Sequence, residues 1–155
     1  MAIPGQWWLI SAGVVLALYI IGEFLCRLEE TGSIGLYEID RMDKKAFEKF
    51  CGRLLKQVGY RVSRPRGGKP WVSYIMERDG VKMALVVKQY GGPVGVRPVE
   101  KAREGASLNR CQRAVVLTNR EFTPEARRRA AALGVELWDR DKLADFLIIS
   151  RSRHL

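Results

Sequence analysis

The sequence predicts an α/β domain, a mixed central sheet flanked by helices, together with one N-terminal transmembrane helix. Three observations lead to this fold class. An uncharged apolar run opens the chain. An amphipathic helical pattern is followed by several apolar runs of strand length. One predicted helix separates two buried strands, and such a crossover implies a parallel pair within the sheet. The predicted order of the domain is α, β, β, β, α, β, α, β, α.

The N-terminal run has the length and composition of a membrane span. Residues 1–22 carry no charged side chain, and the run 7–25 can cross a bilayer core of roughly 30 Å at about 1.5 Å per residue. Trp7 and Trp8 are typical of an interfacial aromatic belt. A cleaved signal peptide is the alternative, but it needs a basic first region and a small-residue cleavage site, and neither is visible. We therefore expect a transmembrane anchor over 1–28.

Cations follow this run and none precedes it. The positive-inside rule then predicts a single-pass protein of the cell membrane, with its N-terminus outside and its soluble domain in the cytoplasm. The acidic, glycine-containing residues 29–42 indicate a linker. We expect the domain over 43–148 and a basic tail over 149–155.

The composition indicates the class of binding partner and the kind of metal site to expect. The chain has 155 residues, a formal net charge of +10, three cysteines and one histidine. The charge favours an anionic partner, either nucleic acid or an acidic membrane face, and a solvated basic surface is the alternative. The cysteines form no C-x-x-C pair, so a zinc site of the usual ligand types is not expected. Their odd number without a disulfide framework indicates a reducing compartment.

The first helix of the domain begins after Asp43, a plausible N-cap, and ends before Gly59. Its apolar face recurs at helical spacing and comprises Phe47, Phe50, Cys51, Leu54, Leu55 and Val58. A short strand begins at 60–63, and the basic, Gly/Pro-rich residues 64–70 predict a mobile loop. Residues 71–77 and 81–90 predict two strands joined by an Asp-Gly turn.

The second half alternates helices and strands. Pro98 suits a first helical position, Thr123 and Pro124 suit an N-cap followed by a first helical residue, and Asp139 suits the N-cap of the last helix. The expected elements are a helix over 98–108, a strand over 114–117, a helix over 124–133, a strand over 135–138 and a helix from 139 to 147. The four-residue apolar run predicts a buried strand.

A series of short motifs stands in a recognisable order between residues 39 and 147. They are Phe47-Glu48, Leu54-Leu55, Gly59-Tyr60-Arg61-Val62, Glu77-Arg78-Asp79-Gly80, Lys88-Gln89-Tyr90, Pro93-Val94-Gly95, Ala114-Val115-Val116-Leu117-Thr118-Asn119, Phe122-Thr123-Pro124-Glu125-Ala126, Gly134-Val135-Glu136-Leu137-Trp138 and Leu143. Their order and spacing resemble the Mrr-type restriction endonuclease domain of the PD-(D/E)xK superfamily. The resemblance implies the restriction-endonuclease-like fold. It also implies a site with an aspartate and a Glu/Gln-x-Lys pair, where the aspartate and the Glu/Gln hold a divalent metal and the lysine positions or polarises water.

The sequence departs from that pattern at the metal-holding positions. The resemblance places the family's aspartate at Ser73, its glutamine at Val86, its lysine at Lys88 and an accessory helix glutamate at Glu48. A hard divalent cation needs anionic oxygen ligands, but serine offers a neutral hydroxyl and valine offers no polar atom. We therefore expect a degenerate site without a resident cofactor. Mg²⁺ is expected only if the site is an active, rearranged one.

Lys88 is then a relic of the catalytic group with a phosphate contact as its remaining role, or a strand-end lysine whose stem covers apolar surface. Glu48 is either a partner that neutralises the charge of Lys88 or a solvated residue of the helix. The further candidates for nucleic-acid contacts are Arg61, Arg64, Arg66 and Lys69. A basic loop can follow a phosphate backbone without reading sequence, and a solvated loop is the alternative.

These observations support three hypotheses about function. The first is a membrane-anchored protein of restriction-endonuclease fold that binds nucleic acid, with DNA expected, and does not cleave it. The second is an active, divalent-metal-dependent DNA endonuclease with a rearranged site. The third is a membrane scaffold that binds an unidentified protein partner, with a basic surface that serves solubility or lipid contact.

Overall fold

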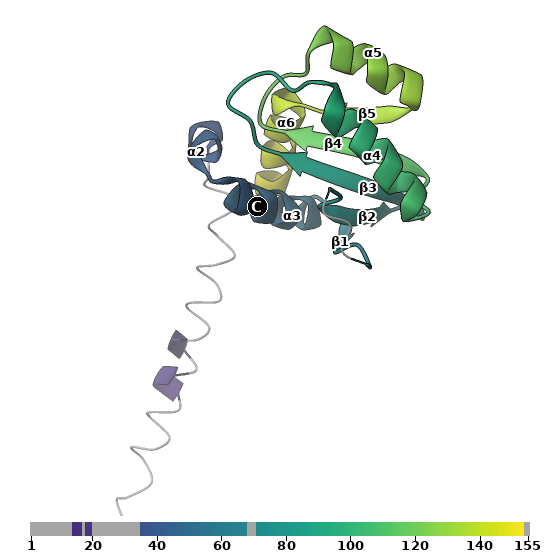
Figure 1. The fold of residues 1–155 in the computed structure, drawn as a ribbon. Helices are drawn as coiled ribbons and strands as arrows, with labels where there is room; N and C mark the ends of the chain where they lie inside the picture. Colours follow the sequence, from purple (N-terminus) through teal and green to yellow (C-terminus); the bar gives the residue numbers. More distant parts are fainter. Residues whose placement is uncertain (1–13, 17, 20–34, 68–70, 154–155) are drawn as a thin grey trace, which may run out of the picture. The chain divides into compact units, whose positions relative to one another are not determined.

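The computed structural model describes residues 14–16, 18–19, 35–67 and 71–153 (Figure 1). The chain divides into two compact units, Met1–Ile34 and Gly35–Leu155. In the first unit the described residues are helical and exposed. Most of the predicted span over 7–25 lies outside the described residues. No helix within the described residues has the length and apolar character that crossing a membrane requires, and the anchor remains a prediction.

The second unit is built on a five-stranded mixed sheet with the spatial order β1-β2-β3-β4-β5. The strands are β1 (Arg61–Ser63), β2 (Tyr74–Arg78), β3 (Val81–Lys88), β4 (Arg113–Thr118) and β5 (Val135–Trp138). The pairs β1–β2 and β2–β3 are antiparallel, whereas β3–β4 and β4–β5 are parallel. The predicted mixed sheet is therefore confirmed, and its parallel part follows from the helical crossovers.

Helices cover both faces of this sheet, as predicted (Figure 1). The helices of this unit are α2 (Leu36–Arg41), α3 (Lys44–Gln57), α4 (Val96–Leu108), α5 (Pro124–Leu133) and α6 (Arg140–Ser152). The helices α4 and α5 pack together on one face, and α3 and α6 pack together on the other. Ala84 and Val86 of β3 belong to the core cluster under α4, which includes Val99 and Ala102. Since strand residues alternate between faces, Leu85 points to the α3 side.

Several helix ends are set by residues that the sequence indicated, whereas α4 begins at Val96 and not at Pro98. Asp43 accepts a hydrogen bond from the backbone of Ala46 at 2.7 Å. Thr123 and Asp139 cap α5 and α6 in the same way. Gly134 ends α5 with a φ of 63°, a left-handed conformation that glycine adopts without strain. Each cap satisfies a backbone group that the first or last helical turn leaves unpaired.

Several predicted boundaries differ from the structure, and two predicted segments, the linker and the tail, overlap helices. The predicted linker over 29–42 overlaps α2, and Ile39 in this helix is fully buried. The predicted basic tail over 149–155 overlaps α6, which continues to Ser152. A helix of six residues is too short to be stable alone, so α2 needs contacts with distant residues in addition to its local cap from Glu38 to the Gly35 N–H.

Candidate functional site

The carboxyl end of β3 places Val86 and Lys88 on the face that α4 covers. Val86 is fully buried in the core cluster beneath α4. Lys88 is partly exposed and lies opposite Thr118 of β4. In the described part of the chain the Lys88 ammonium has no hydrogen bond or ion pair. Ligands of open α/β sheets commonly bind at the carboxyl ends of parallel strands, so Lys88 stands where an anion can reach it.

Ser73, which precedes β2, lies beside Val86. Its backbone N–H donates to the Leu85 carbonyl at 2.8 Å, and its hydroxyl oxygen accepts from the Val87 N–H at 3.1 Å. The residue is 7% exposed. The structure therefore brings together Ser73, Val86 and Lys88, the three positions that the resemblance assigned to one site. The Ser73 hydroxyl extends the hydrogen-bond ladder between β2 and β3.

Glu48 on α3 pairs with Arg64 and not with Lys88. The Arg64 Nη1 donates to the Glu48 carboxylate at 2.5 Å and to the Ser73 carbonyl at 3.1 Å. The Arg64 guanidinium also lies 4.4 Å from the centre of the Tyr74 ring, a cation–π distance. The hydrogen bond with Glu48 raises the pKa of Arg64 above its ordinary value. A guanidinium thus stands between the two carboxylate positions of the family pattern, Glu48 and Ser73.

Carboxylates are sparse around these positions. No group of three or more His, Cys, Asp or Glu side chains within the described residues is arranged to hold a metal ion. Glu77 forms an ion pair with Arg61 at 2.6 Å on the neighbouring strand. Glu100, at the start of α4, forms an ion pair with Arg129 at 3.0 Å.

The other predicted nucleic-acid contacts are dispersed. Arg61 lines a hollow beside Gly59 and Arg153, whereas Arg64 lines a different one beside α3. Arg66 is exposed. Lys69 lies outside the described residues. The four basic residues that the sequence grouped on one loop therefore do not all converge on one surface.

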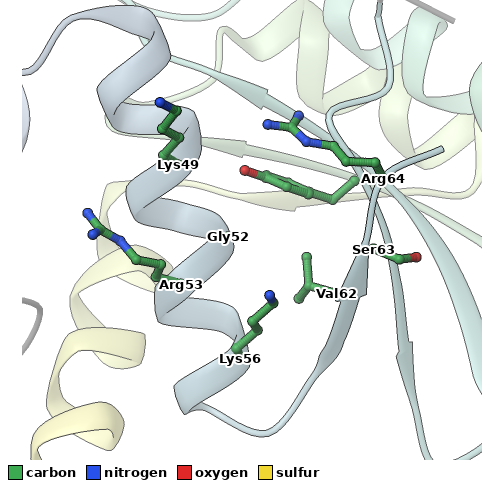
Figure 2. Close-up of a pocket in the computed structure, with 8 residues that line it drawn as sticks. Lys49, Gly52, Arg53, Lys56, Val62, Ser63 and Arg64 are labelled. Carbon is green, nitrogen blue, oxygen red and sulfur yellow. The ribbon is translucent and has the colours of Figure 1, made fainter. Parts of the chain in front are cut away.

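The hollow beside α3 was not foreseen. We call it the α3 groove; its volume is about 460 Å³ (Figure 2). It is lined by Lys49, Gly52, Arg53, Lys56, Val62, Ser63, Arg64 and Tyr74. Lys49, Arg53 and Lys56 recur at i, i+4 and i+7, so the sequence did contain a signal: three cations on one helical face.

Gly52 forms the floor of the α3 groove and explains how Tyr74 reaches α3. A Cβ atom at Gly52 would lie 2.7 Å from Cζ of the Tyr74 ring, which is too close for any real side chain. The Tyr74 hydroxyl donates to the Glu48 carbonyl at 3.0 Å. The ring is therefore held flat between α3 and Arg64, and it fixes one wall of the groove.

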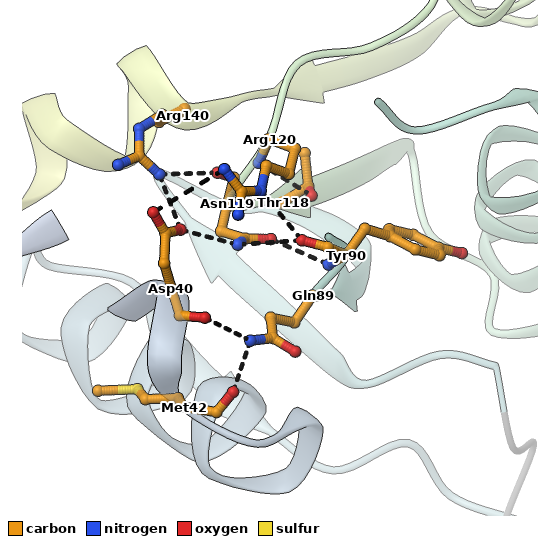
Figure 3. A network of polar contacts seen from close by, with 8 residues as sticks. All are labelled: Asp40, Met42, Gln89, Tyr90, Thr118, Asn119, Arg120 and Arg140. Carbon is orange, nitrogen blue, oxygen red and sulfur yellow. Dashed lines mark hydrogen bonds and ion pairs between the residues drawn. The ribbon is translucent and has the colours of Figure 1, made fainter. Parts of the chain in front are cut away.

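A polar network ties α2 to the edge of the sheet where Lys88 lies (Figure 3). The Asp40 carboxylate accepts from Asn119 at 2.9 Å and from Arg140 at 2.8 Å. The Gln89 side-chain amide donates to the Met42 carbonyl at 2.5 Å. Burial raises the pKa of Asp40, but the hydrogen bonds from Arg140 and Asn119 outweigh it, so the pKa lies below its ordinary value of 3.8.

Two solved structures are similar to this chain. The first is AspBHI, a DNA modification-dependent restriction endonuclease, with a TM-score of 0.55 and 19% identity over 77% of this chain and 35% of that chain. The second is the crystal structure of AF1548, a protein of unknown function, with a TM-score of 0.54 and 18% identity over 68% of this chain and 65% of that chain. At these identities the likeness shows the fold, and this chain spans less than two thirds of either protein.

No curated protein matches the sequence. The family model described as restriction endonuclease, of the Mrr catalytic-domain type, matches residues 39–147. This range holds the whole sheet, α3, α4 and α5, half of α2 and most of α6. The match agrees with the predicted resemblance and with the mixed sheet. The chain therefore belongs to the Mrr-type restriction endonuclease family.

Proposed function

We propose that this chain is a membrane-anchored member of its family whose domain binds nucleic acid, with DNA as the expected ligand, and does not cleave it. One observation carries the proposal. The two positions at which the family pattern holds its metal carry Ser73, whose hydroxyl is engaged by the Val87 N–H, and Val86, which is fully buried among apolar side chains.

These residues do not fit a divalent metal. Mg²⁺ takes oxygen ligands in near-octahedral geometry and binds through one or two carboxylates beside substrate phosphates. Glu48 is the carboxylate beside Ser73, and it is already paired with the Arg64 guanidinium. That fixed positive charge would repel a metal ion at the same place. Metal-activated water, the usual nucleophile of this fold, is therefore not expected.

Binding of nucleic acid does not require the metal that cleavage requires. A phosphate backbone attracts lysine and arginine side chains without any metal, and release of counterions supplies most of the sequence-independent affinity. The chain carries a formal net charge of +10. Lys88 at the sheet edge and Arg64 on the α3 side are both partly or fully accessible cations. The charge and these exposed cations favour a polyanion as the ligand.

Anchoring is the second part of the proposal. The apolar run over 7–25, whose one charged residue is Glu23 near its end, supports a single span in the cell membrane, and the cations that follow it support a cytoplasmic domain. The chain should stay with the membrane fraction after alkaline carbonate extraction. In sealed vesicles of inside-out orientation, protease should degrade the domain. Release by carbonate would contradict the span.

The experiment uses the full chain in nanodiscs of zwitterionic lipid. Anisotropy of a labelled duplex, measured between about 50 and 200 mM salt, should show binding that weakens steeply as salt rises. Supercoiled plasmid incubated with Mg²⁺ or Mn²⁺ should remain intact. Cleavage that Lys88→Ala abolishes would instead establish the active endonuclease. Absence of binding at about 50 mM salt would refute nucleic-acid binding.

A further inference from the structure

The α3 groove presents free positive charge at a regular spacing. From Lys49 to Lys56 the helix advances seven residues, about 10 Å at about 1.5 Å per residue. One DNA strand carries a phosphate about every 3.4 Å of helix axis. Three cations along this face therefore match a short stretch of one strand. The buried residues of α3, such as Phe50 and Leu54, lie on its opposite side and leave this face to solvent.

The three cations are not neutralised by the domain. Within the described residues, Lys49, Arg53 and Lys56 form no ion pair. The basic run of α5 is different, because each of its arginines has an acidic partner. These pairs are Arg127 with Asp139, Arg128 with Glu125, and Arg129 with Glu100. Charge that is already paired attracts a polyanion weakly, so the free charge of the basic helix faces lies on α3 and not on α5.

Arg64 completes the opposite wall of the groove (Figure 2). Its Nη1 is fixed by Glu48 and by the Ser73 carbonyl, and its plane lies over the Tyr74 ring. Glu48 offsets the charge of Arg64, so Arg64 contributes hydrogen-bond donors more than free charge. A guanidinium has five N–H donors, most of which stay available, and the side chain is 59% exposed. A cation that is held in place in this way loses little conformational entropy when a phosphate binds.

We propose that the α3 groove is the main phosphate-contacting surface of the domain, and that Lys49, Arg53, Lys56 and Arg64 bind the backbone of duplex DNA. This inference rests on the proposed function and moves the main DNA-binding surface from Lys88 to the α3 groove. Lys88 belongs to the face of the sheet that α4 covers, whereas the groove lies on the α3 side. The two places are therefore separable by mutation.

The shape of the site favours a nucleic-acid backbone over a lipid surface. The groove is a hollow of about 460 Å³ with Val62 and Tyr74 among its walls. A ridge of phosphates and sugars can enter a hollow, and its sugars can contact the apolar wall. A flat layer of headgroups reaches only the rim. Electrostatic attraction to anionic lipid is the competing outcome, and the experiment includes it.

The test compares two triple variants of the full chain in zwitterionic nanodiscs, with Lys88→Gln measured beside them. The groove variant carries Lys49→Gln, Arg53→Gln and Lys56→Gln. The control variant replaces three exposed cations of the α4 side without an ion pair in the described residues: Arg97→Gln, Arg103→Gln and Arg110→Gln. Each triple variant removes three cations, so the formal net charge falls from +10 to +7 in both. Near-ultraviolet circular dichroism checks that all variants are folded.

The measurement is the affinity for a labelled duplex as a function of salt. Each lost phosphate contact reduces the slope of log K against log salt by about 0.9, so the groove variant should lose about 2.7 of the slope. That exponent corresponds to an affinity loss of up to about 500-fold at 0.1 M salt relative to 1 M. The control variant should lose far less.

Equal losses in the two triple variants would overturn the inference, because net charge alone would then explain binding. Binding that survives in the groove variant and is lost in Lys88→Gln would also overturn it, and would leave the proposed function intact. If the wild-type chain itself does not bind, the proposed function fails and this inference fails with it. In that case, crosslinking of Lys56 to phosphatidylserine in anionic nanodiscs would assign the groove to the membrane.

Discussion

Replacement of Asp40 by alanine removes the acceptor that attaches α2 to the sheet. The Asp40 carboxylate accepts two hydrogen bonds, from Arg140 and from Asn119, and its side chain is 19% exposed. A hydrogen bond to a charged group contributes about 1.5–3 kcal/mol net. Because the Arg140 side chain is 31% exposed and water can replace part of the loss, we expect about 2–3 kcal/mol of destabilisation for Asp40→Ala and about 1 kcal/mol for Asp40→Asn.

The assay is urea unfolding of the full chain in a mild non-ionic detergent, with hydrogen exchange as a second measurement. The unfolding midpoint should fall with an unchanged slope, because the surface exposed on unfolding stays the same. The amides of α2 should lose protection first, since a helix of six residues is not stable alone. Asp141→Asn is the matched control: Asp141 is exposed, and its replacement should change stability by less than about 0.5 kcal/mol.

The effect of Asp40 should also depend on pH. Its pKa in the folded protein lies below the ordinary value of 3.8. The carboxylate therefore contributes stability that is fully present above this ordinary value and is lost as the pH falls through the lower folded value. The difference in unfolding free energy between wild type and Asp40→Asn should be constant near neutral pH and shrink in acid. A difference that is absent at pH 7, or that grows in acid, would refute this account of Asp40.

Three further outcomes test the packing and the charges. Gly105→Ala should destabilise the domain by about 1–3 kcal/mol in urea unfolding, because the new Cβ would lie 2.2 Å from Cγ2 of Val72; a gain in stability would contradict this close approach. Burial raises the pKa of the Cys51 thiol well above its ordinary value, so this thiol should react with maleimide only after unfolding. Glu48→Gln should change stability by less than about 1 kcal/mol, since its ion pair with Arg64 is partly exposed, and should strengthen duplex binding; weaker binding would argue against a phosphate contact by Arg64.

The sequence predicts those parts of the fold that are set by interactions between residues close together in the chain. The strand Val135–Trp138 and the helix Pro124–Leu133 have the predicted bounds. Thr123, Gly134 and Asp139 set the neighbouring boundaries through interactions within three or four residues. Such interactions are visible in any window of the sequence. Alternating helices and strands then leave few possible topologies, because crossovers of parallel strands have a fixed hand.

The parts that were not predicted depend on contacts between distant residues. Asp40 and Arg140 are separated by 100 positions, and their hydrogen bond makes α2 part of the domain. Glu48 and Arg64 are separated by 16 positions, and no helical or strand period relates them. A sequence pattern indicates which face of an element is apolar, but it does not indicate which charge will find which partner.

In the motif Lys88-Gln89-Tyr90, two residues form hydrogen bonds that stabilise the fold, and the side chain of the third forms none within the described residues. The Gln89 amide holds the end of α2, and the backbone N–H of Tyr90 donates to the side chain of Asn119 at 3.0 Å. These contacts explain the loop after β3 by stability alone. The Lys88 ammonium forms no hydrogen bond or ion pair within the described residues. Lys49, Arg53 and Lys56 of the α3 groove likewise form no ion pair within the described residues, whereas Arg64 of the same groove is paired with Glu48. Unpaired cations therefore lie on both sides of the sheet, and the groove variant compared with Lys88→Gln tests which side makes the proposed contact with DNA.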